Sequence, residues 1–186
     1  MVLDVKHDDP RGRLLDAAEA LFYARGVQAV GIDEIRDRAG ISLKRLYRAF
    51  GSKQGLLIAV LERRDLRWRV RLIDHVERHR DPGARILAVF DWLELWFSEP
   101  DFRGCAWVNI YGELGSVSPS VADQARRHKR AFRTYLDGLA RAADLSPDAA
   151  DALYLLAEGA IVTAGIFQTV APAAQARAAA RVLLAG

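Results

Sequence analysis

Apolar residues recur along this chain at steps of three and four positions, which is the spacing of one face of an α-helix. Leu14, Ala18, Leu21 and Phe22 follow this spacing near the beginning, and residues 153–164 follow it near the end. Alternating β-branched segments joined by Asn-Gly or Asp-Gly turns, which are typical of β-hairpins, are absent from the sequence. The pattern therefore predicts an all-α fold.

Four prolines follow an Asp or a Ser, and this pairing is typical of helix starts. The short oxygen-bearing side chain caps the helix, and Pro occupies the first helical position, where its missing N–H is not needed. The pairs are Asp9-Pro10, Asp81-Pro82, Ser118-Pro119 and Ser146-Pro147. Together with the periodicity they predict nine helices, near residues 10–25, 32–39, 43–49, 53–79, 82–98, 104–114, 119–143, 147–169 and 172–184.

Residues 31–57, GIDEIRDRAGISLKRLYRAFGSKQGLL, predict two short helices joined by a tight turn. Gly40 is expected to end the first helix in the left-handed conformation, and Ser42 is expected to cap the second. Leu46 and Phe50 fall on the inward face of that second helix. Two short helices joined in this way form a helix-turn-helix unit, whose second helix enters the major groove of DNA.

Residues 14–57 resemble the DNA-binding domain of the TetR (tetracycline-repressor-like) family of bacterial regulators. The elements that carry the resemblance are Phe22, Arg25-Gly26, Ile35, Ala39-Gly40-Ile41-Ser42, Leu46-Tyr47, Phe50, Ser52-Lys53 and Leu56. Beyond Arg64 only the length and the all-helical pattern are similar. The resemblance implies an N-terminal three-helix DNA-binding bundle over residues 1–52 and a C-terminal helical effector-binding and dimerisation domain over residues 53–186.

The resemblance also implies which side chains contact DNA. The implied contacts are Ser42, Lys44, Arg45, Tyr47 and Arg48 on the recognition helix and, to phosphate, Lys53. The chemistry agrees, because arginine can bind guanine O6 and N7 bidentately and hydroxyl groups suit phosphate oxygens. For Tyr47, packing against the domain core is the alternative.

Two positions depart from the family pattern. Gly31 stands where the family usually has a threonine that caps the helix and touches phosphate, so we expect one backbone contact to be missing. Lys44 stands where a small residue is common, and it adds a long cation near the base edges. These departures bear on the operator sequence and not on the binding activity.

Positive charge is concentrated in the N-terminal part of the chain. Residues 1–71 carry 15 Lys and Arg against 10 Asp and Glu, which leaves 12 against 14 for residues 72–186 from totals of 27 and 24. Within residues 41–71 the acidic residues are Glu62 and Asp65 alone. A polyanion is the natural partner of such a segment, because neutralised phosphates release condensed counterions. A solvated basic helix face is the alternative.

Cysteine usage and hydropathy indicate a cytoplasmic protein. Cys105 is the single cysteine, so it cannot form an intramolecular disulfide, and we expect no secretory signal before Arg13. The longest strongly apolar stretch that we identify, residues 88–97, is broken by Asp91 and Glu94. It falls short of the roughly 20 residues that a membrane span needs, and we expect no membrane-spanning role.

Residues 90–111 are unusually rich in aromatic side chains. The family resemblance implies an effector held among the fifth to eighth helices, and an aromatic-lined cleft suits a planar apolar ligand. The candidate effector-binding residues are Trp92, Trp96, Trp107, Asn109, Tyr111 and Glu158. Rings that simply fill the core are the alternative, and for any single ring that alternative is favoured. We expect a small apolar or aromatic effector and no cofactor.

Other chemistry has little support in the sequence. Cys105 follows Gly104 at a predicted helix start, which could lower its thiol pKa and permit a redox role, but a buried packing residue is the commoner case. His75 and His79 lie one helical turn apart without a third ligand, so we expect no metal site. No catalytic triad, His-Glu-x-x-His or glycine-rich phosphate motif is present, and the sequence predicts that the chain is not an enzyme.

The sequence supports one functional hypothesis and one alternative. We expect a homodimer in which residues 147–168 and 172–184 of both chains form an intermolecular four-helix bundle. The small residues expected to let those helices approach are Ala157, Gly159, Ala160, Ala164 and Gly165. Such a dimer would be a transcription regulator, a repressor released from operator DNA by a small effector. The alternative is an all-α small-molecule-binding or catalytic protein whose basic N-terminal bundle serves another partner.

Overall fold

A computed structural model describes residues 9–185, and over these residues the chain forms nine α-helices and no strand. They are α1 (Pro10–Arg25), α2 (Ile32–Ala39), α3 (Leu43–Phe50), α4 (Lys53–Val76), α5 (Pro82–Phe97), α6 (Ala106–Leu114), α7 (Pro119–Ala142), α8 (Pro147–Phe167) and α9 (Ala171–Leu184). Each helix expected from the sequence is present, with both ends within three residues of the expected positions. The prediction of an all-α fold is confirmed.

The caps expected from the four proline pairs are present as well. In each pair the side chain before the proline accepts a hydrogen bond from a backbone N–H of the first helical turn, at distances between 2.7 and 3.4 Å. The capping residues are Asp9, Asp81, Ser118 and Ser146. Each cap of this kind is worth about 1 kcal/mol, so local sequence fixes where α1, α5, α7 and α8 begin.

The chain forms two compact units, one ending at Arg63 and the other beginning at Arg64. This division falls inside α4, so the first part of that helix belongs to one unit and the remainder to the other. Each unit has its own hydrophobic core.

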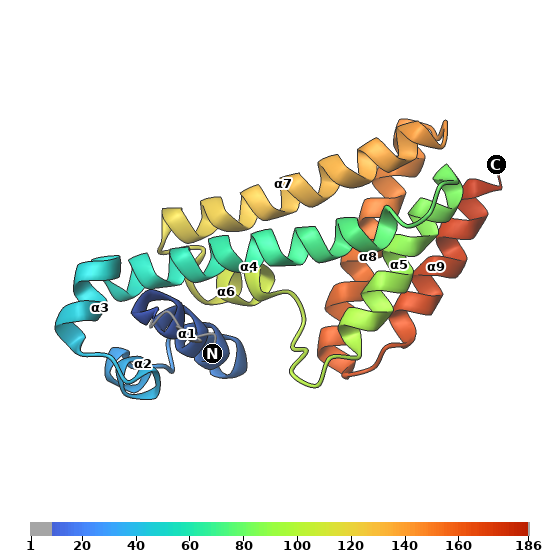
Figure 1. Cartoon of the computed structure of the whole chain (residues 1–186). Coiled ribbons are helices and arrows are strands. Elements are labelled where there is room, and N and C mark those ends of the chain that lie inside the picture. The colour runs from blue at the N-terminus through green and yellow to red at the C-terminus, as the bar shows by residue number, and fades with distance from the viewer. Residues whose placement is uncertain (1–8, 186) are drawn as a thin grey trace, which may run out of the picture. The chain divides into compact units, whose positions relative to one another are not determined.

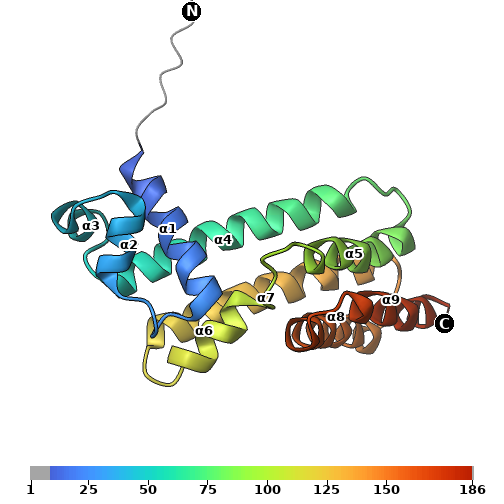
Figure 2. The same cartoon turned by 90° about the horizontal axis from the view of Figure 1, so that it is seen from below.

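The first unit consists of α1, α2, α3 and the beginning of α4 (Figures 1 and 2). Its core is formed by aliphatic and aromatic side chains that are almost completely buried, including Leu14, Phe22, Ile35, Leu46 and Leu57. These residues come from all four helices, and so each helix contributes its inward face to the same core.

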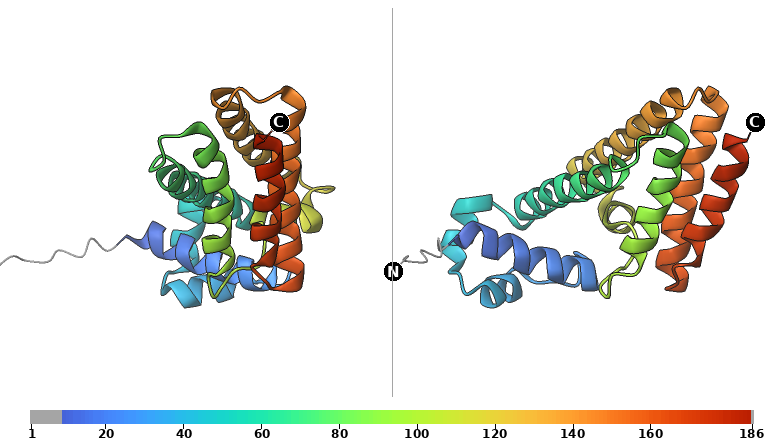
Figure 3. Two further views of the ribbon diagram at one scale, coloured as in Figure 1. Left: turned by 90° about the vertical axis from the view of Figure 1, so that its right-hand side faces the viewer. Right: turned by 45° about the vertical axis from the view of Figure 1, so that its right-hand side comes forward.

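The second unit contains the remainder of α4 and helices α5 to α9. Helices α5, α8 and α9 lie side by side, as Figure 3 shows, and α6 packs against α7. Ala157, Ala160 and Ala164 of α8 are buried within this packing. Gly165 lies so close to Gly104 that an added Cβ would come within 2.8 Å of the Gly104 Cα.

The small residues of α8 were expected to let the helices of an intermolecular four-helix bundle approach closely. Ala157, Ala160 and Ala164 are buried within one chain, where α8 packs on α9, and Gly165 lies against Gly104. Their part in an interface between two chains stays a prediction. Gly159 is the member of the set that faces solvent. Small side chains permit close approach of helices both within a chain and between chains, and the sequence pattern alone does not distinguish these two cases.

Helix α8 also carries the longest apolar stretch, in contrast to the expectation that residues 88–97 do. Among the described residues it is the helix that is long and apolar enough to cross a membrane by length and composition, and 33% of the relevant window is buried in the structure. One face packs against α5, α7 and α9, as in a core helix. Its exposed face carries Leu155, Val162, Ile166 and Phe167.

An aromatic cluster centred on Trp68 of α4 forms the middle of the second unit. The ring of Trp68 meets those of Trp92, Trp96 and Phe132 edge-on, with ring centroids 5.0, 5.7 and 5.2 Å apart. Edge-on pairs of this kind add about 0.5–1.5 kcal/mol each beyond the area that they bury. The cluster therefore ties α4 to both α5 and α7.

Next to this cluster, a buried histidine pairs with a carboxylate. His128 on α7 donates from Nδ1 to Oδ1 of Asp65 on α4 over 2.7 Å, and its ring stacks on Trp107 at 3.6 Å. Burial alone would raise the pKa of Asp65, but the hydrogen bond and charge of His128 bring it below its ordinary value. Burial would likewise lower the pKa of His128, while the bond to Asp65 raises it. These contacts therefore favour the charged form of both groups.

We predict that Asp65→Asn lowers the free energy of unfolding by about 1–3 kcal/mol near pH 5.5, because His128 loses a charged partner. The raised pKa of His128 contributes stability that is complete below its unfolded value of about 6.5 and is lost as pH rises through the folded pKa. The lowered pKa of Asp65 contributes stability that is lost as pH falls through its folded pKa. Urea unfolding at pH 5.5 and pH 9 should show the larger effect at pH 5.5.

Asp123→Asn is the matched control. Asp123 pairs with Arg126 at 2.9 Å on the solvent-exposed side of α7, and exposed pairs contribute about 0–1 kcal/mol. The control should change stability little at either pH. An Asp65→Asn effect of equal size at both pH values would show that the Asp65–His128 pair is not charged.

Candidate nucleic-acid interface and ligand cavities

The turn between α2 and α3 has the geometry expected of a helix-turn-helix. Gly40 adopts the left-handed conformation with φ +64°, and its N–H bonds back to the carbonyls of Arg36 and Asp37. Ser42 then caps α3, its side chain accepting the Arg45 N–H over 3.4 Å. Gly51 ends α3 with φ +73°. The positive φ at both glycines explains why the short helices can follow each other so closely.

Helix α3 buries one side and exposes the rest. Leu46 is completely buried, and Ile41 and Ala39 close the core beneath the turn. The exposed side chains are those of Lys44, Arg45, Tyr47 and Arg48. Tyr47 is 44% exposed, which fits an outward contact better than packing in the core.

The cations of α3 are available to an external anion. Lys44, Arg45 and Arg48 make no ion pair with any residue between 9 and 185. Their positive charge is therefore not neutralised within the described chain. Three exposed cations on an eight-residue helix suit contacts with a polyanion.

Several cations of α4 do have acidic partners, which the local sequence does not show. Arg63 pairs with Asp16 and Glu19 of α1 at 2.8 and 2.9 Å. Arg69 pairs with Asp65, and Arg71 pairs with Glu99. Because these acids come partly from distant positions, counting charges between residues 41 and 71 overstates the free positive charge of α4.

Lys53 has a defined place at the start of α4. Its Nζ donates to the Val27 carbonyl over 2.7 Å and lies 5.9 Å from the centre of the Phe22 ring. Ser52 caps the helix by accepting the Gly55 N–H at 3.0 Å. The lysine thus holds the loop after α1, and its contact with phosphate stays a prediction.

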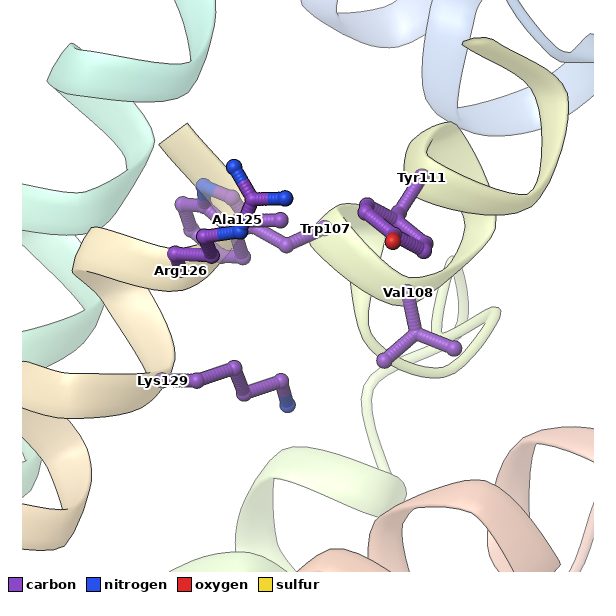
Figure 4. A pocket seen from close by; sticks show the side chains of 6 residues that line it. All are labelled: Trp107, Val108, Tyr111, Ala125, Arg126 and Lys129. Carbon is purple, nitrogen blue, oxygen red and sulfur yellow. The ribbon is translucent and has the colours of Figure 1, made fainter. Parts of the chain in front are cut away.

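A cavity of about 270 Å³ lies between α6 and α7 (Figure 4). The residues that line it are Trp107, Val108 and Tyr111 of α6 and Ala125, Arg126 and Lys129 of α7. Figure 4 shows Val108 and Tyr111 on one side and Arg126 and Lys129 on the other. Tyr111 is 46% exposed, so the cavity can be reached from solvent.

A second cavity of about 250 Å³ lies between the later part of α4 and α7. Its aromatic lining comes from Trp68, Phe132 and Tyr135. The Trp68 Nε1 and Tyr135 hydroxyl are buried without a hydrogen-bond partner in the described chain. Burial raises the pKa of Tyr135 to about 12, so its hydroxyl stays protonated at neutral pH.

The six effector candidates do not come together in one place. Trp107 and Tyr111 line the α6/α7 cavity, and Glu158 reaches its rim through an ion pair with Lys129 at 2.5 Å. Trp92 and Trp96 stack on each other with ring centroids 5.6 Å apart in the aromatic core.

Neither Trp92 nor Trp96 lines either of these two cavities. The side chain of Asn109 donates to the Arg103 carbonyl over 2.9 Å. A role for any of the six in effector binding stays a prediction.

Sequence reasoning missed the α7 wall of the α6/α7 cavity. Ala125 and Lys129 are one helical turn apart and face α6, with Arg126 beside them. Helical spacing marks them as one face of α7, but no sequence signal says that α6 packs there. As for metals, the described residues contain no group of three or more His, Cys, Asp or Glu that could hold an ion.

The first unit therefore has a helix-turn-helix with unpaired cations on its second helix, and the second unit has cavities of ligand size. A helix-turn-helix with exposed cations on its second helix is typical of a DNA-binding regulator. Comparison with known proteins identifies the family. Residues 14–60 match the family model described as "Bacterial regulatory proteins, tetR family".

Two curated relatives illustrate the sequence similarity. The transcriptional activator FasR of Mycolicibacterium smegmatis is 54% identical over 56 residues, which are 30% of this chain and 26% of that protein. The transcriptional repressor BdcR of Escherichia coli is 31% identical over 128 residues, 68% of this chain and 64% of that protein. The chain thus spans less than two thirds of the length of either relative.

Solved structures match over almost the whole chain. SCO4454, a TetR-family transcriptional regulator from Streptomyces coelicolor, superposes with a TM-score of 0.86 at 27% identity, covering 94% of each chain. A TetR-type regulator from Streptomyces avermitilis has a TM-score of 0.78 at 30% identity, covering 93% of this chain and 98% of that one. The chain belongs to the TetR family, whose members are DNA-binding transcription regulators rather than enzymes.

Proposed function

We propose that this chain is a cytoplasmic, homodimeric repressor that binds double-stranded operator DNA through α3 and leaves it when a small apolar or aromatic effector binds. The observation that carries the proposal is that α3 has one buried apolar face and one exposed face with positively charged side chains. Leu46 anchors the helix in the core, and Lys44, Arg45 and Arg48 extend from the exposed side without acidic partners. This arrangement presents fixed cations to a DNA groove, and the family assignment favours it over a catalytic role.

Repression is favoured over activation by the extent of the relatives' similarity. The match to the activator FasR covers 30% of this chain, about the length of a DNA-binding domain. The match to the repressor BdcR covers 68% and extends into the second unit. The second unit is where effector binding and dimerisation are proposed, so the longer match is the better guide.

The homodimer is supported by the exposed apolar face of α8 and α9. Leu155, Ile166 and Phe167 on α8 and Val182 on α9 are each between 67% and 72% exposed. Large apolar side chains this exposed on two helices that pack together favour an interaction surface. Two copies related by a two-fold axis would cover this face and present two recognition helices to successive major grooves, about 34–36 Å apart.

We propose that the effector binds in the α6/α7 cavity. Its lining is mostly apolar and aromatic, and its two cations are already paired, Arg126 with Asp123 and Lys129 with Glu158. A neutral planar molecule fits such a lining better than a strongly charged one. The signal would reach the DNA-binding unit through the chain itself, since α4 belongs to both units.

Selection of duplexes from a random library tests the regulator function. The wild-type chain should enrich a two-fold symmetric sequence and bind it with strongly salt-dependent affinity. If no sequence is enriched at any salt concentration, the chain is not an operator-binding regulator.

Arg45→Ala should weaken binding to the selected operator by about 1–3 kcal/mol per half-site and relax discrimination at one base position. The reason is that a base-contacting arginine loses its two hydrogen bonds to guanine. Fluorescence anisotropy on a panel of single-base operator variants measures this. Discrimination that is unchanged at every position would exclude base contact by Arg45.

Lys53→Ala tests the proposed phosphate contact, which should not depend on the base sequence. It should weaken binding to operator and random DNA alike and reduce the slope of log affinity against log salt by about one per half-site. Its bond to the Val27 carbonyl also contributes to folding, so thermal unfolding is measured in parallel. A loss confined to operator DNA would mean that Lys53 contributes to sequence recognition.

Ile166→Asp should increase the dimer dissociation constant about tenfold or more, because a carboxylate would be buried in the proposed interface. The side chain is 70% exposed in one chain, so the monomer fold should be unaffected. Sedimentation velocity measures the change. Val117→Asp, at a residue 74% exposed beyond α6, is the matched control and should leave the dimer intact. A dimer that tolerates Ile166→Asp would place the interface elsewhere.

Tyr111→Ala should weaken binding of the neutral fluorescent probe N-phenyl-1-naphthylamine roughly threefold to tenfold, since one aromatic wall of the α6/α7 cavity is lost. Probe emission during titration gives the affinity. Leu95→Ala, at an exposed position on α5, serves as control and should have no effect. Equal affinity of the Tyr111→Ala and wild-type chains would place the apolar site outside this cavity.

A further inference from the structure

Ionisable side chains from four parts of the second unit meet around the buried thiol of Cys105. They are Asp65 of α4, Cys105 immediately before α6, His128 and Lys129 of α7, and Glu158 of α8. Lys129 Nζ lies 3.4 Å from the Cys105 sulfur and 2.5 Å from Glu158 Oε2. Residues from such distant parts of the sequence are brought together by the fold alone.

The contacts around Cys105 favour the thiolate. Burial alone would raise the pKa of Cys105, but the hydrogen bond with His128 and the charge of Lys129 bring it below its ordinary value. His128 is in turn held by Asp65 over 2.7 Å, so Asp65, His128 and Cys105 form a relay. A carboxylate, an imidazole and a thiol in this order are the usual means of activating a cysteine nucleophile.

A space-filling role would not need these charges. Cys105 is 3% exposed, and an alanine or a serine could occupy the same place before α6. Burying ionisable groups costs free energy unless each finds a partner, so surrounding a passive side chain with His128 and Lys129 would bring no gain in packing. The cluster is therefore better explained by chemistry at the sulfur.

The α6/α7 cavity borders this cluster at Lys129. Lys129, which touches the sulfur, also lines that cavity of about 270 Å³. The lining residue Trp107 is 2% exposed, and its Nε1 has no hydrogen-bond partner in the described chain. Oε1 of Glu158 is also buried without a partner. These atoms leave hydrogen-bonding capacity that a bound polar molecule can use.

We propose that Cys105 is a covalent modification site for small α,β-unsaturated carbonyl compounds that enter through the α6/α7 cavity. The sulfur attacks the β-carbon, a C–S bond forms, and the electron pair of the C=C bond moves toward the carbonyl as an enolate. The proton that left the thiol is held on His128 and returns to the α-carbon. The product is a thioether in which all atoms of the thiol and the reagent are retained, so no oxidant or other reactant is needed.

Lys129 is a positioning residue in this reaction. Its ammonium stands beside the sulfur and stabilises the thiolate, while Glu158 fixes the direction of the lysine side chain. Removing the charge of Lys129 should therefore slow the reaction most at pH values where the free thiol would be protonated.

The single cysteine permits a direct test with N-ethylmaleimide as the probe. Intact mass measured against time at pH 6.5 gives the rate constant for adduct formation on the folded chain, and glutathione under the same conditions gives the reference. The rate constant for Cys105 should equal or exceed that for glutathione, with one adduct per chain and none in Cys105→Ser. A folded chain that reacts more slowly than glutathione, and faster only as urea unfolds it, would show that Cys105 is an inert packing residue.

Substitutions of residues near Cys105 distinguish activation of the thiol by its neighbours from mere exposure of the thiol to the reagent. Lys129→Met should reduce the rate constant about tenfold or more at pH 6.5 and much less at pH 9.5, where the thiol ionises unaided. Lys129→Arg should restore most of the rate. Arg130→Met removes an exposed charge next to it on α7 and should leave the rate unchanged. An equal loss at both pH values, or an equal effect of Arg130→Met, would contradict activation by Lys129.

Discussion

The second unit depends on the packing of Trp68, an aromatic side chain on a helix that is otherwise rich in arginine. Its ring meets Trp92 and Trp96 from α5 and Phe132 from α7, so one residue sets the spacing of three helices. The Asp65–His128 pair lies one turn away and fixes the same contact between α4 and α7. Trp68 and Phe132 of this cluster also line the cavity between α4 and α7. The same helix begins in the DNA-binding unit, so Trp68 lies on a helix that belongs to both units.

Local signals were enough to predict the fold and much of the DNA-binding unit. The caps before Pro10, Pro82, Pro119 and Pro147 act through the residues next to them, so they operate in the same way in the sequence and in the folded chain. The left-handed turn at Gly40 is equally local. Exposure of the α3 cations follows from the burial of its apolar face and could be deduced from helical spacing. Helical spacing could not predict the hydrogen bond from Lys53 to the Val27 carbonyl. It also could not predict the acidic residues of α1 that pair with Arg63 of α4.

Prediction was weakest where helices from distant parts of the chain meet. Trp92 and Trp96 were proposed for the effector because aromatic residues are dense in that segment, but Trp68 on α4 draws both rings into the core. The α7 wall of the α6/α7 cavity and the surroundings of Cys105 depend on how α6, α7 and α8 pack, and no periodicity encodes that. The alanines of α8 show the same limit, since small residues mark a close helix contact without saying whether the partner is in the same chain. Contacts between distant elements therefore required the structure, whereas the exposure of the α3 cations could be predicted from one motif.

In the function proposed for this chain, α3 of each protomer enters a major groove and contacts guanine through its cations. Methylation interference on a library-selected duplex tests this most directly, because methylation at guanine N7 blocks contacts in the major groove alone. We predict two short clusters of interfering guanines related by two-fold symmetry, with centres about 10–10.5 base pairs, or a multiple of that spacing, apart on one face of the duplex. Binding that is insensitive to guanine N7 methylation, or interference without a two-fold relation, would contradict the claim.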